Sequence, residues 1–143
     1  MYFVSELLQA KEHEVWSIPP DTSVYDSLKL MAEKNVGALL VLDADKLVGV
    51  FSERDYARKV ILEGKSSKEL SVKEIMSTEV VSVNPSQSID ECMALMTNKR
   101  IRHLPVLEGN RLVGIISIGD VVKATISERE VTITHLENYI RAS

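Results

Sequence analysis

The sequence predicts a mixed α/β (α+β) protein made of two β-α-β-β-α repeats. Two observations carry this prediction. The chain of 143 residues matches itself without a gap when residues 14–55 are laid over residues 79–120. About 16 of these 42 positions are identical, where ordinary residue frequencies give about two or three. Such a repeat favours pseudo-two-fold symmetry, with sheets and helices packed around a central cleft, and clefts of this kind are favoured ligand sites.

Both repeats show the same order of elements. In the first repeat, Ser23 precedes a helix with Asp26 as the partner in a capping box, and Val24, Leu28 and Met31 form its buried stripe. In the second repeat, Ser88 and Glu91 take the capping positions. The remaining expected elements, in order, are a short strand over 15–18 and its equivalent in the second repeat, buried strands over 36–42 and 104–107, turns at 43–45 and 108–110, strands over 46–52 and 111–117, and second helices from Ser52 and Ser117.

The repeats set the expected domain boundaries. We expect the first repeat with its lead-in over 1–63, a linker and second lead-in over 64–78, the second repeat over 79–127 and a helical tail over 128–143. The lead-in VSELL (4–8) echoes VKEIM (72–76) at a shift of 68 residues. A single repeat of about 60 residues buries too little surface to be more than marginally stable alone, so the two repeats are expected to share a core.

Composition excludes several classes of function. The single cysteine excludes an internal disulfide and a cysteine-based zinc site. The longest apolar stretch, 36–42, is too short for a membrane span, and the N-terminus does not have the pattern of a signal peptide. These features predict a cytoplasmic protein. A net charge of −4 and a pI near 5.4 argue against nucleic-acid binding.

Catalysis is not expected. The chain has no Gly-rich phosphate loop, no GxSxG elbow and no plausible metal triad, and its three histidines are scattered along the sequence. We therefore predict no catalytic residues and no metal ligands.

The end of each repeat carries the same motif, GVFSERD (49–55) and GIISIGD (114–120). Together with VKEIM (72–76) and IRHLPVLEGNRLVGIIS (101–117), these motifs make residues 4–126 resemble a tandem cystathionine β-synthase (CBS) domain pair, or Bateman module, of the stand-alone type. The resemblance implies binding of an adenosyl ligand between the repeats: AMP, ADP, ATP, S-adenosylmethionine or NAD(H). It also implies a regulatory role.

The Ser-x-x-Asp motifs have two interpretations. Spacing alone is that of a helix capping box. A helix N-terminus also attracts phosphate, and a carboxylate one turn inside the helix can accept both ribose hydroxyls. The resemblance implies that Asp120 and Asp55 bind ribose and that Ser117 and Ser52 lie near phosphate.

The one dense basic cluster is Lys99, Arg100, Arg102 and His103. The first two suit the end of a helix. Arg102 and His103 directly precede a buried strand, where desolvated cations need a partner, and a ligand phosphate would serve. Because histidine titrates near neutrality, we expect ligand affinity to fall as the pH rises from 6 to 8.

Other positions are open between two interpretations. Arg54 suits either a ligand phosphate or a surface ion pair with Glu53 or Asp26. Residues that the resemblance places around the adenine are also candidates for ordinary core: Ile18, Val36, Gly37 and Ala38 beside Asp120, and Val83 and Ile101 around Asp55.

Residues outside the motifs have simpler expected roles. Gly49 and Gly114 are expected to allow close strand packing, Cys92 to fill space rather than act as a nucleophile, and Trp16 to pack at the start of the first strand. The apolar residues of the two ends suit either the chain's own core or a dimer contact, and these are Tyr2, Phe3, Val4, Leu7 and Leu8, and Ile133, Leu136, Tyr139 and Ile140.

The predicted function is therefore a non-catalytic adenine-nucleotide sensor. It would act through ligand-dependent rearrangement of a homodimer, read by an unknown downstream protein, with no metal, nucleic acid or membrane involved. The alternative is a scaffold for dimerisation or protein contacts that binds no ligand.

Overall fold

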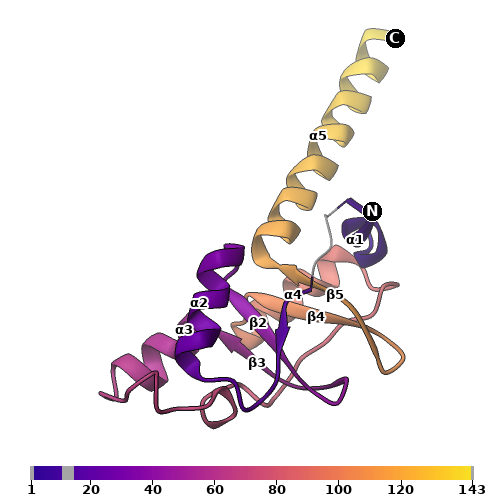
Figure 1. Cartoon of the computed structure of the whole chain (residues 1–143). Coiled ribbons are helices and arrows are strands. Elements are labelled where there is room, and N and C mark those ends of the chain that lie inside the picture. The colour runs from indigo at the N-terminus through magenta and orange to yellow at the C-terminus, as the bar shows by residue number, and fades with distance from the viewer. Residues whose placement is uncertain (1, 11–14, 143) are drawn as a thin grey trace. The chain divides into compact units, whose positions relative to one another are not determined.

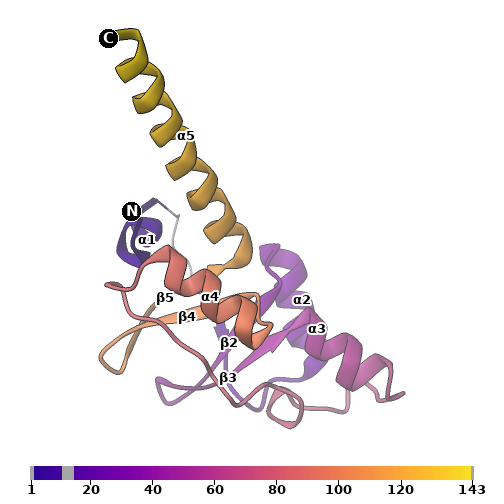
Figure 2. The same ribbon diagram turned by 180° about the vertical axis from the view of Figure 1, so that it is seen from behind.

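The computed structural model describes residues 2–10 and 15–142, which form two compact units (Figures 1 and 2). The repeat-1 unit contains residues 15–81, and the repeat-2 unit contains residues 2–10 together with 82–142. Each unit is mixed helix and strand, as the sequence predicts. Among the described residues, no helix combines the length and the apolar character that a membrane span needs.

The repeat-1 unit holds a three-stranded sheet in the order β1-β2-β3, with β1 parallel and β3 antiparallel to β2. Its elements are β1 (Ser17–Ile18), α2 (Val24–Lys34), β2 (Ala38–Asp43), β3 (Lys46–Ser52), α3 (Glu53–Tyr56), the π-helix η1 (Ala57–Ile61) and the 3₁₀-helix η2 (Val72–Glu74). The predicted strand 46–52 has the bounds that the structure shows, and the predicted strands 15–18 and 36–42 are shorter or shifted by one or two residues.

Helix α2 begins at the residue that its sequence indicates. The Ser23 side chain accepts a hydrogen bond from the Asp26 N–H at 3.0 Å, which satisfies one unpaired amide of the first turn. Asn35 ends the helix in the left-handed conformation, with φ 54°. Val24 and Met31 are buried in the core of the unit, on which α2 packs.

The repeat-2 unit is built on the two-stranded antiparallel sheet β4-β5. Its elements are α1 (Val4–Ala10), α4 (Ile89–Lys99), β4 (His103–Glu108), β5 (Arg111–Ser117) and α5 (Ile118–Ala142). Helix α4 has the complete capping box that the sequence predicts, because Ser88 and Glu91 exchange backbone and side-chain hydrogen bonds. Its apolar residues Ile89 and Met96 are buried.

The first strand of the second repeat, in contrast to the prediction, is reduced to one parallel bridge between Val83 and Val106. In the first repeat the Leu40 N–H donates to the Trp16 C=O at 3.2 Å, which extends the pairing of β1. The residue equivalent to Leu40 is Pro105, which has no N–H to donate. The second repeat therefore forms a shorter pairing at this edge.

Each lead-in segment packs against a strand glycine within its unit. An ideal Cβ at Gly49 would lie 2.5 Å from Met76 Sδ, and one at Gly114 would lie 2.6 Å from Leu8 Cδ2. Leu8 and Met76 occupy the same place in the two echoing lead-ins, VSELL and VKEIM. The packing role expected for both glycines is therefore confirmed, because a side chain at either position would displace its lead-in.

The two ends of the described chain differ in whether they cover the core of their unit. The N-terminal segment covers the core of the repeat-2 unit, where Val4 is fully buried and donates its N–H to the Gln87 C=O at 2.9 Å. The C-terminal segment does not cover the chain's own core. Its four apolar residues, Ile133, Leu136, Tyr139 and Ile140, are all exposed on α5, so that interpretation was wrong for them.

Candidate functional site

The Ser-x-x-Asp motif of the first repeat forms a capping box at the start of α3. The Ser52 N–H donates to Asp55 Oδ2 at 2.9 Å, the Ser52 hydroxyl to the same oxygen at 3.1 Å, and the Asp55 N–H to Ser52 Oγ at 3.2 Å. The capping interpretation of the motif is therefore confirmed here. Asp55 is buried, and its bonds to Ser52 hold the carboxylate in one orientation.

The second carboxylate oxygen of Asp55 also has partners. Ser77 Oγ lies 3.2 Å from Asp55 Oδ1, and the Lys59 ammonium lies 3.3 Å from the same atom. Lys59 also donates to the Ile75 C=O at 3.1 Å. These contacts join the start of α3 to the segment after η2, and a ligand at Asp55 would compete with them.

The second motif has the same geometry with different surroundings. The Ser117 N–H donates to Asp120 Oδ2 at 2.8 Å, and the Asp120 N–H donates to Ser117 Oγ at 3.2 Å. Asp120 is half-buried, and the residue equivalent to Lys59 is Ala124. The second capping box therefore presents its carboxylate without a cation four residues further along the helix.

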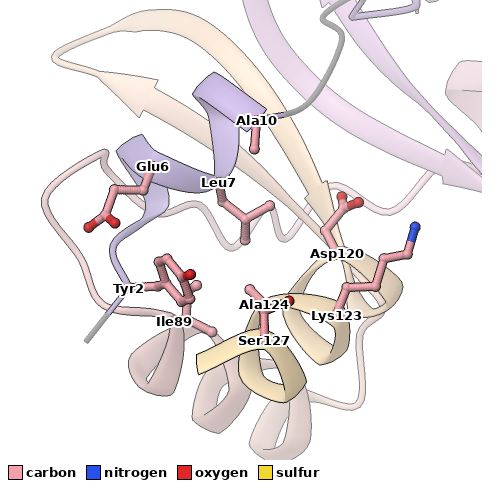
Figure 3. A pocket seen from close by; sticks show the side chains of 9 residues that line it. All are labelled: Tyr2, Glu6, Leu7, Ala10, Ile89, Asp120, Lys123, Ala124 and Ser127. Atoms are coloured by element: carbon pink, nitrogen blue, oxygen red, sulfur yellow. The ribbon is translucent and has the colours of Figure 1, made fainter. Parts of the chain in front are cut away.

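Asp120 lines a pocket of about 350 Å³ within the repeat-2 unit. Asp120 and Lys123 extend from the first turns of α5 at one side, and Leu7 extends from α1 across the pocket (Figure 3). The lining residues are Tyr2, Glu6, Leu7, Ala10, Ile89, Asp120, Lys123, Ala124 and Ser127. The pocket therefore combines an apolar floor with charged groups of both signs, a composition suited to a small polar ligand.

Backbone hydrogen bonds tie each helix start to the strand beside it. The Glu53 N–H donates to the Gly37 C=O at 3.1 Å, and the Ile118 N–H donates to the Arg102 C=O at 2.8 Å. The sheet register places Ala38 opposite Ser52 and His103 opposite Ser117. Ala38 and Ser52 are therefore neighbours in the first unit, as His103 and Ser117 are in the second. The first amide of each helix is already paired.

The basic residues lie in different environments. His103 is half-buried at the start of β4, whereas Lys99, Arg100 and Arg102 are exposed. The premise that Arg102 is desolvated beside the strand was wrong, because Arg102 is exposed and burial in β4 is limited to its middle residues, Leu104, Pro105 and Val106. Arg100 ends α4 in the left-handed conformation with φ 55°, the position that Asn35 holds in the first repeat. Arg54 is exposed in the first turn of α3.

The residues proposed for the adenine divide by burial. Ile18, Ala38 and Val83 are buried, and Val36, Gly37 and Ile101 are half-buried. Ile18 belongs to the hydrophobic core of the repeat-1 unit, and Val36 packs against that core. Their pairing with Asp120, and that of Val83 and Ile101 with Asp55, stays a prediction.

Cys92 is fully buried in α4, as its filler role predicts. Burial raises the pKa of its thiol to about 11, with a smaller contribution from the negative charge of Glu91. A thiol in this state is a poor nucleophile near neutral pH. Trp16 packs against the core of the repeat-1 unit, and the Lys34 ammonium lies 4.3 Å from its ring centre. Among the residues that the structure describes, no three His, Cys, Asp or Glu side chains are grouped as metal ligands.

Sequence reasoning missed Lys59, Ser77 and Lys123. The spacing of Asp55 and Lys59 at i and i+4 is a signal that could have found the ion pair. Ser77 lies 22 residues from Asp55, so only the fold brings them together. Lys123 is identified as a candidate site residue by the pocket that it lines.

Comparison with known proteins supplies the family. A family model described as "CBS domain" matches residues 4–62 and 72–127. The mitochondrial CBS domain-containing protein CBSX3 of Arabidopsis thaliana is 42% identical over 132 residues, which are 89% of this chain and 64% of that protein. The chain thus spans less than two thirds of the length of that relative.

Similar solved structures are also proteins with CBS domains. A protein with CBS domains from Burkholderia ambifaria, described in terms of signal transduction, is 53% identical with a TM-score of 0.86, and the match covers 88% of this chain and 95% of that one. A hexameric CBS-CP12 protein from bloom-forming cyanobacteria is 33% identical with a TM-score of 0.76, covering 85% of this chain and 66% of that one.

A more distant structure carries a ligand. The CBS domain pair of protein MJ0100, in complex with 5′-methylthioadenosine and S-adenosyl-L-methionine, has a TM-score of 0.78 over 89% of this chain and 98% of that one. At 22% identity this likeness shows the fold alone. CBS domain pairs are generally regulatory, non-catalytic modules, and they commonly bind adenosyl ligands. With both of its repeats matched by one family model, this chain belongs to the CBS domain family, as a pair of CBS domains.

Proposed function

We propose that this CBS domain pair is a non-catalytic regulatory module that binds an adenosyl ligand, with the ribose on Asp120. The observation that carries the proposal is the difference between the two capping-box aspartates. Asp120 lines a pocket of about 350 Å³, whereas Asp55 is buried against Ser77 and Lys59. The second repeat therefore supplies the stronger site.

The chemistry of the capping box suits a ribose. An ionised carboxylate has about four acceptor positions on its two oxygens, and Asp120 uses Oδ2 to accept the Ser117 N–H. That bond holds the carboxylate in place before the ligand arrives, so less conformational entropy is lost when the ribose hydroxyls bind. Asp55 would have to exchange existing partners for ribose and serves as the weaker site.

Side chains that can carry positive charge are available to bind the phosphates. Lys123 lines the pocket with Asp120, and His103 lies opposite Ser117 in the sheet register. The exposed Arg102 and Arg54 would provide forked contacts to phosphate oxygens, and Ser52 and Ser117 further hydrogen bonds. The adenine walls stay a separate prediction, Ile18, Val36, Gly37 and Ala38 for Asp120 and Val83 and Ile101 for Asp55, because none of these residues lines the pocket that Asp120 and Lys123 share.

The proposal includes a homodimer whose arrangement changes with the ligand, and an unidentified downstream protein that reads the change. The ligand class is AMP, ADP, ATP, NAD(H) or S-adenosylmethionine, without a metal. A single buried thiol suits a reducing compartment such as the cytoplasm.

Thermal unfolding with each of these ligands tests the proposal. A ligand at a hundred times its dissociation constant stabilises the fold by about 2.7 kcal/mol, which for a chain of this size raises the Tm by roughly 5–10 °C. Asp120→Asn is the informative variant, because an amide oxygen still accepts the Ser117 N–H while the negative charge is lost. Glu91→Gln is its matched control, because Glu91 has the same capping role in α4 of the same unit.

We expect one ligand to raise the Tm of the wild type and of Glu91→Gln, and to leave Asp120→Asn unchanged. An equal rise in all three proteins would remove Asp120 from the site. No rise with any ligand would favour the alternative, a scaffold for dimerisation or protein contacts.

A further inference from the structure

The pocket beside Asp120 has a lining that the adenine walls do not explain. It lies within the repeat-2 unit, between α1 and the first turns of α5. None of the residues expected around the adenine lines it, and Arg102 and His103 do not line it either. What this pocket binds therefore has to be inferred from the side chains that do line it.

One end of the pocket carries two opposite charges. Asp120 and Lys123 are three residues apart on α5 and so lie on the same side of the helix, and Figure 3 shows both side chains at the same end of the pocket. Within the described part of the chain, Lys123 forms no ion pair with Asp120 or with any other carboxylate. The two charges therefore do not neutralise one another, and one ligand can bind to both.

The middle of the pocket is apolar. Ile89 is buried beneath it, and the half-buried Leu7 points from α1 toward Ala124 on α5 (Figure 3). The ring of Tyr2 adds further apolar surface. Covering these side chains is favourable only for an apolar part of a ligand, because only apolar surface gains free energy by leaving water.

The third charged residue of the lining is Glu6. Figure 3 shows it at the end of the pocket opposite Asp120. Its Oε1 accepts a hydrogen bond from the Phe3 N–H at 3.3 Å, at the start of α1. A carboxylate at this end repels a ligand whose far end is acidic.

We propose that this pocket binds a free α-amino acid with an apolar side chain. The ammonium group donates hydrogen bonds to Asp120, and the carboxylate accepts them from Lys123. An α-amino acid carries these two charged groups on one carbon atom, which matches two opposite charges at one end of a pocket. Such charge-assisted hydrogen bonds are about twice as strong as neutral ones.

The apolar side chain of the amino acid would cover Leu7, Ile89 and Ala124. A nucleotide could satisfy Asp120 with its ribose and Lys123 with a phosphate, but neither group would cover the apolar middle of the pocket. The volume of about 350 Å³ lies at the lower end of the range for small-molecule sites. Size and lining therefore both favour a small ligand with one apolar group.

This inference goes beyond the proposed function, although both use Asp120. A ribose and an amino acid cannot occupy the same carboxylate together, so the two ligands would compete. The test therefore uses the full chain without any nucleotide. Its failure would leave adenosyl binding untouched, and a chain that binds no adenosyl ligand could still bind an amino acid.

Calorimetric titration with L-leucine, L-methionine and L-phenylalanine tests the ligand class. We expect at least one of the three to bind. The amide of that amino acid lacks the carboxylate and its N-acetyl derivative lacks the ammonium, so we expect each to bind at least about tenfold more weakly. Glycine, which has no side chain, is also expected to bind more weakly. No binding by any of the three, or equal binding of the amide, the N-acetyl derivative or glycine, would overturn the proposal.

Two variants test the position of the site. Lys123→Gln removes the charge that holds the carboxylate, and we expect at least about a tenfold loss of affinity for the amino acid. Arg129→Gln is the matched control, because Arg129 is an exposed cation of the same helix that does not line the pocket. Wild-type affinity in Lys123→Gln, or an equal loss in both variants, would overturn the proposal.

Ala124→Leu fills the apolar middle of the pocket without changing its charge. We expect this variant to lose affinity for the amino acid by about tenfold or more, because the two side chains would compete for the same space. Circular dichroism checks that its fold is kept. A folded Ala124→Leu variant that binds the amino acid as well as the wild type would place the side chain elsewhere and overturn the proposal.

Discussion

The Lys59 ammonium lies 3.3 Å from Asp55 Oδ1, four residues further along the chain, and donates to the Ile75 C=O as well. The equivalent residue in the second repeat is Ala124. Two aspartates with the same capping geometry therefore have different electrostatic surroundings. Under the proposed function, the ion pair with Lys59 makes Asp55 the weaker of the two ribose sites.

Replacing Lys59 with alanine is expected to improve ligand binding at the first repeat. The substitution places alanine four residues after Asp55, as Ala124 stands after Asp120, and removes a partner that a ribose would have to displace. Because Lys59 is partly exposed, we expect a gain of about two- to fivefold in affinity at the weaker site, the range of a solvent-screened ion pair. Calorimetric titration with the ligand identified by thermal unfolding would resolve this as a tighter second binding step.

Lys65→Ala is the matched control, because Lys65 forms a surface ion pair with Glu63 at 3.1 Å in the same unit without contacting Asp55. We expect this variant to bind the ligand like the wild type in calorimetric titration. A weaker second step in Lys59→Ala would mean that Lys59 itself contacts the ligand, and the interpretation of Asp55 as the occupied site would need revision.

A side chain at position 49 is expected to destabilise the repeat-1 unit. In Gly49→Ala the new Cβ would lie 2.5 Å from Met76 Sδ and 3.1 Å from the Ser77 carbonyl oxygen. Methionine can move, but the backbone of Ser77 is held by hydrogen bonds with Val50 in both directions. We expect a loss of about 1–3 kcal/mol in the free energy of unfolding, the usual cost of overpacking, measured by denaturant titration.

Met76→Ala in combination with Gly49→Ala separates the two contacts. If the methionine carries most of the clash, the double variant loses less stability than the sum of the single losses. Gly114→Ala is the comparison in the other repeat, where the close contact is with the flexible end of Leu8 alone. A loss at Gly114 greater than the loss at Gly49 would contradict this account.

Much of the fold follows from the sequence, because the repeat lets each weak signal be read twice. The strands 46–52 and 111–117 and the capped helices from Ser23 and Ser88 were predicted correctly. The shortening of the first strand of the second repeat was not predicted. Pro105 is visible in the sequence, but its effect on the strand depends on which backbone hydrogen bond the missing N–H would have made. Which unit each lead-in joins was not predictable, because that depends on contacts between residues far apart in the chain.

The hairpin turn of the first repeat offers a stabilising substitution. Ala44 and Asp45 join β2 to β3 with φ values of 48° and 68°, in the left-handed region that disfavours a side chain with a Cβ. The second repeat has Gly109 at the position of Ala44, with φ 64°. We expect Ala44→Gly to stabilise the unit by up to about 1 kcal/mol, because relief of backbone strain exceeds the added entropy of the unfolded chain.

Gly109→Ala provides the opposite change in the matching turn and should lower stability by a similar amount. A Cβ at Gly109 would meet open space, so the expected loss comes from the backbone conformation and not from crowding. A Tm for Ala44→Gly below that of the wild type, measured by calorimetry, would show that the turn is not strained by alanine.

The site was predictable in part for a physical reason. A capping box is local, so the Ser52 and Asp55 geometry could be inferred from spacing alone. The difference between Asp55 and Asp120 arises from Ser77, which the chain returns to the site after 22 residues, and from a pocket built by α1 and α5. Burial of Arg102 was wrongly inferred because an adjacent buried strand says little about a side chain at its open end.

Cys92 is expected to make stability fall at alkaline pH. Burial raises the pKa of its thiol from 9.0 to about 11. The folded state therefore favours the protonated thiol, and its contribution is fully present below pH 9 and lost as the pH rises from 9 to 11. Two pKa units correspond to about 2–3 kcal/mol in the free energy of unfolding.

Cys92→Ser isolates this contribution from that of lysines and tyrosines that titrate in the same range. Serine should be tolerated, because the equivalent Ser27 is fully buried and donates its hydroxyl to the Ser23 carbonyl oxygen at 2.8 Å. Denaturant unfolding between pH 8 and pH 11 should show a steeper loss for the wild type than for the variant. Parallel curves would mean that the thiol ionises as readily in the folded chain as in the unfolded one, and rapid alkylation of the native protein at pH 8 would support that conclusion.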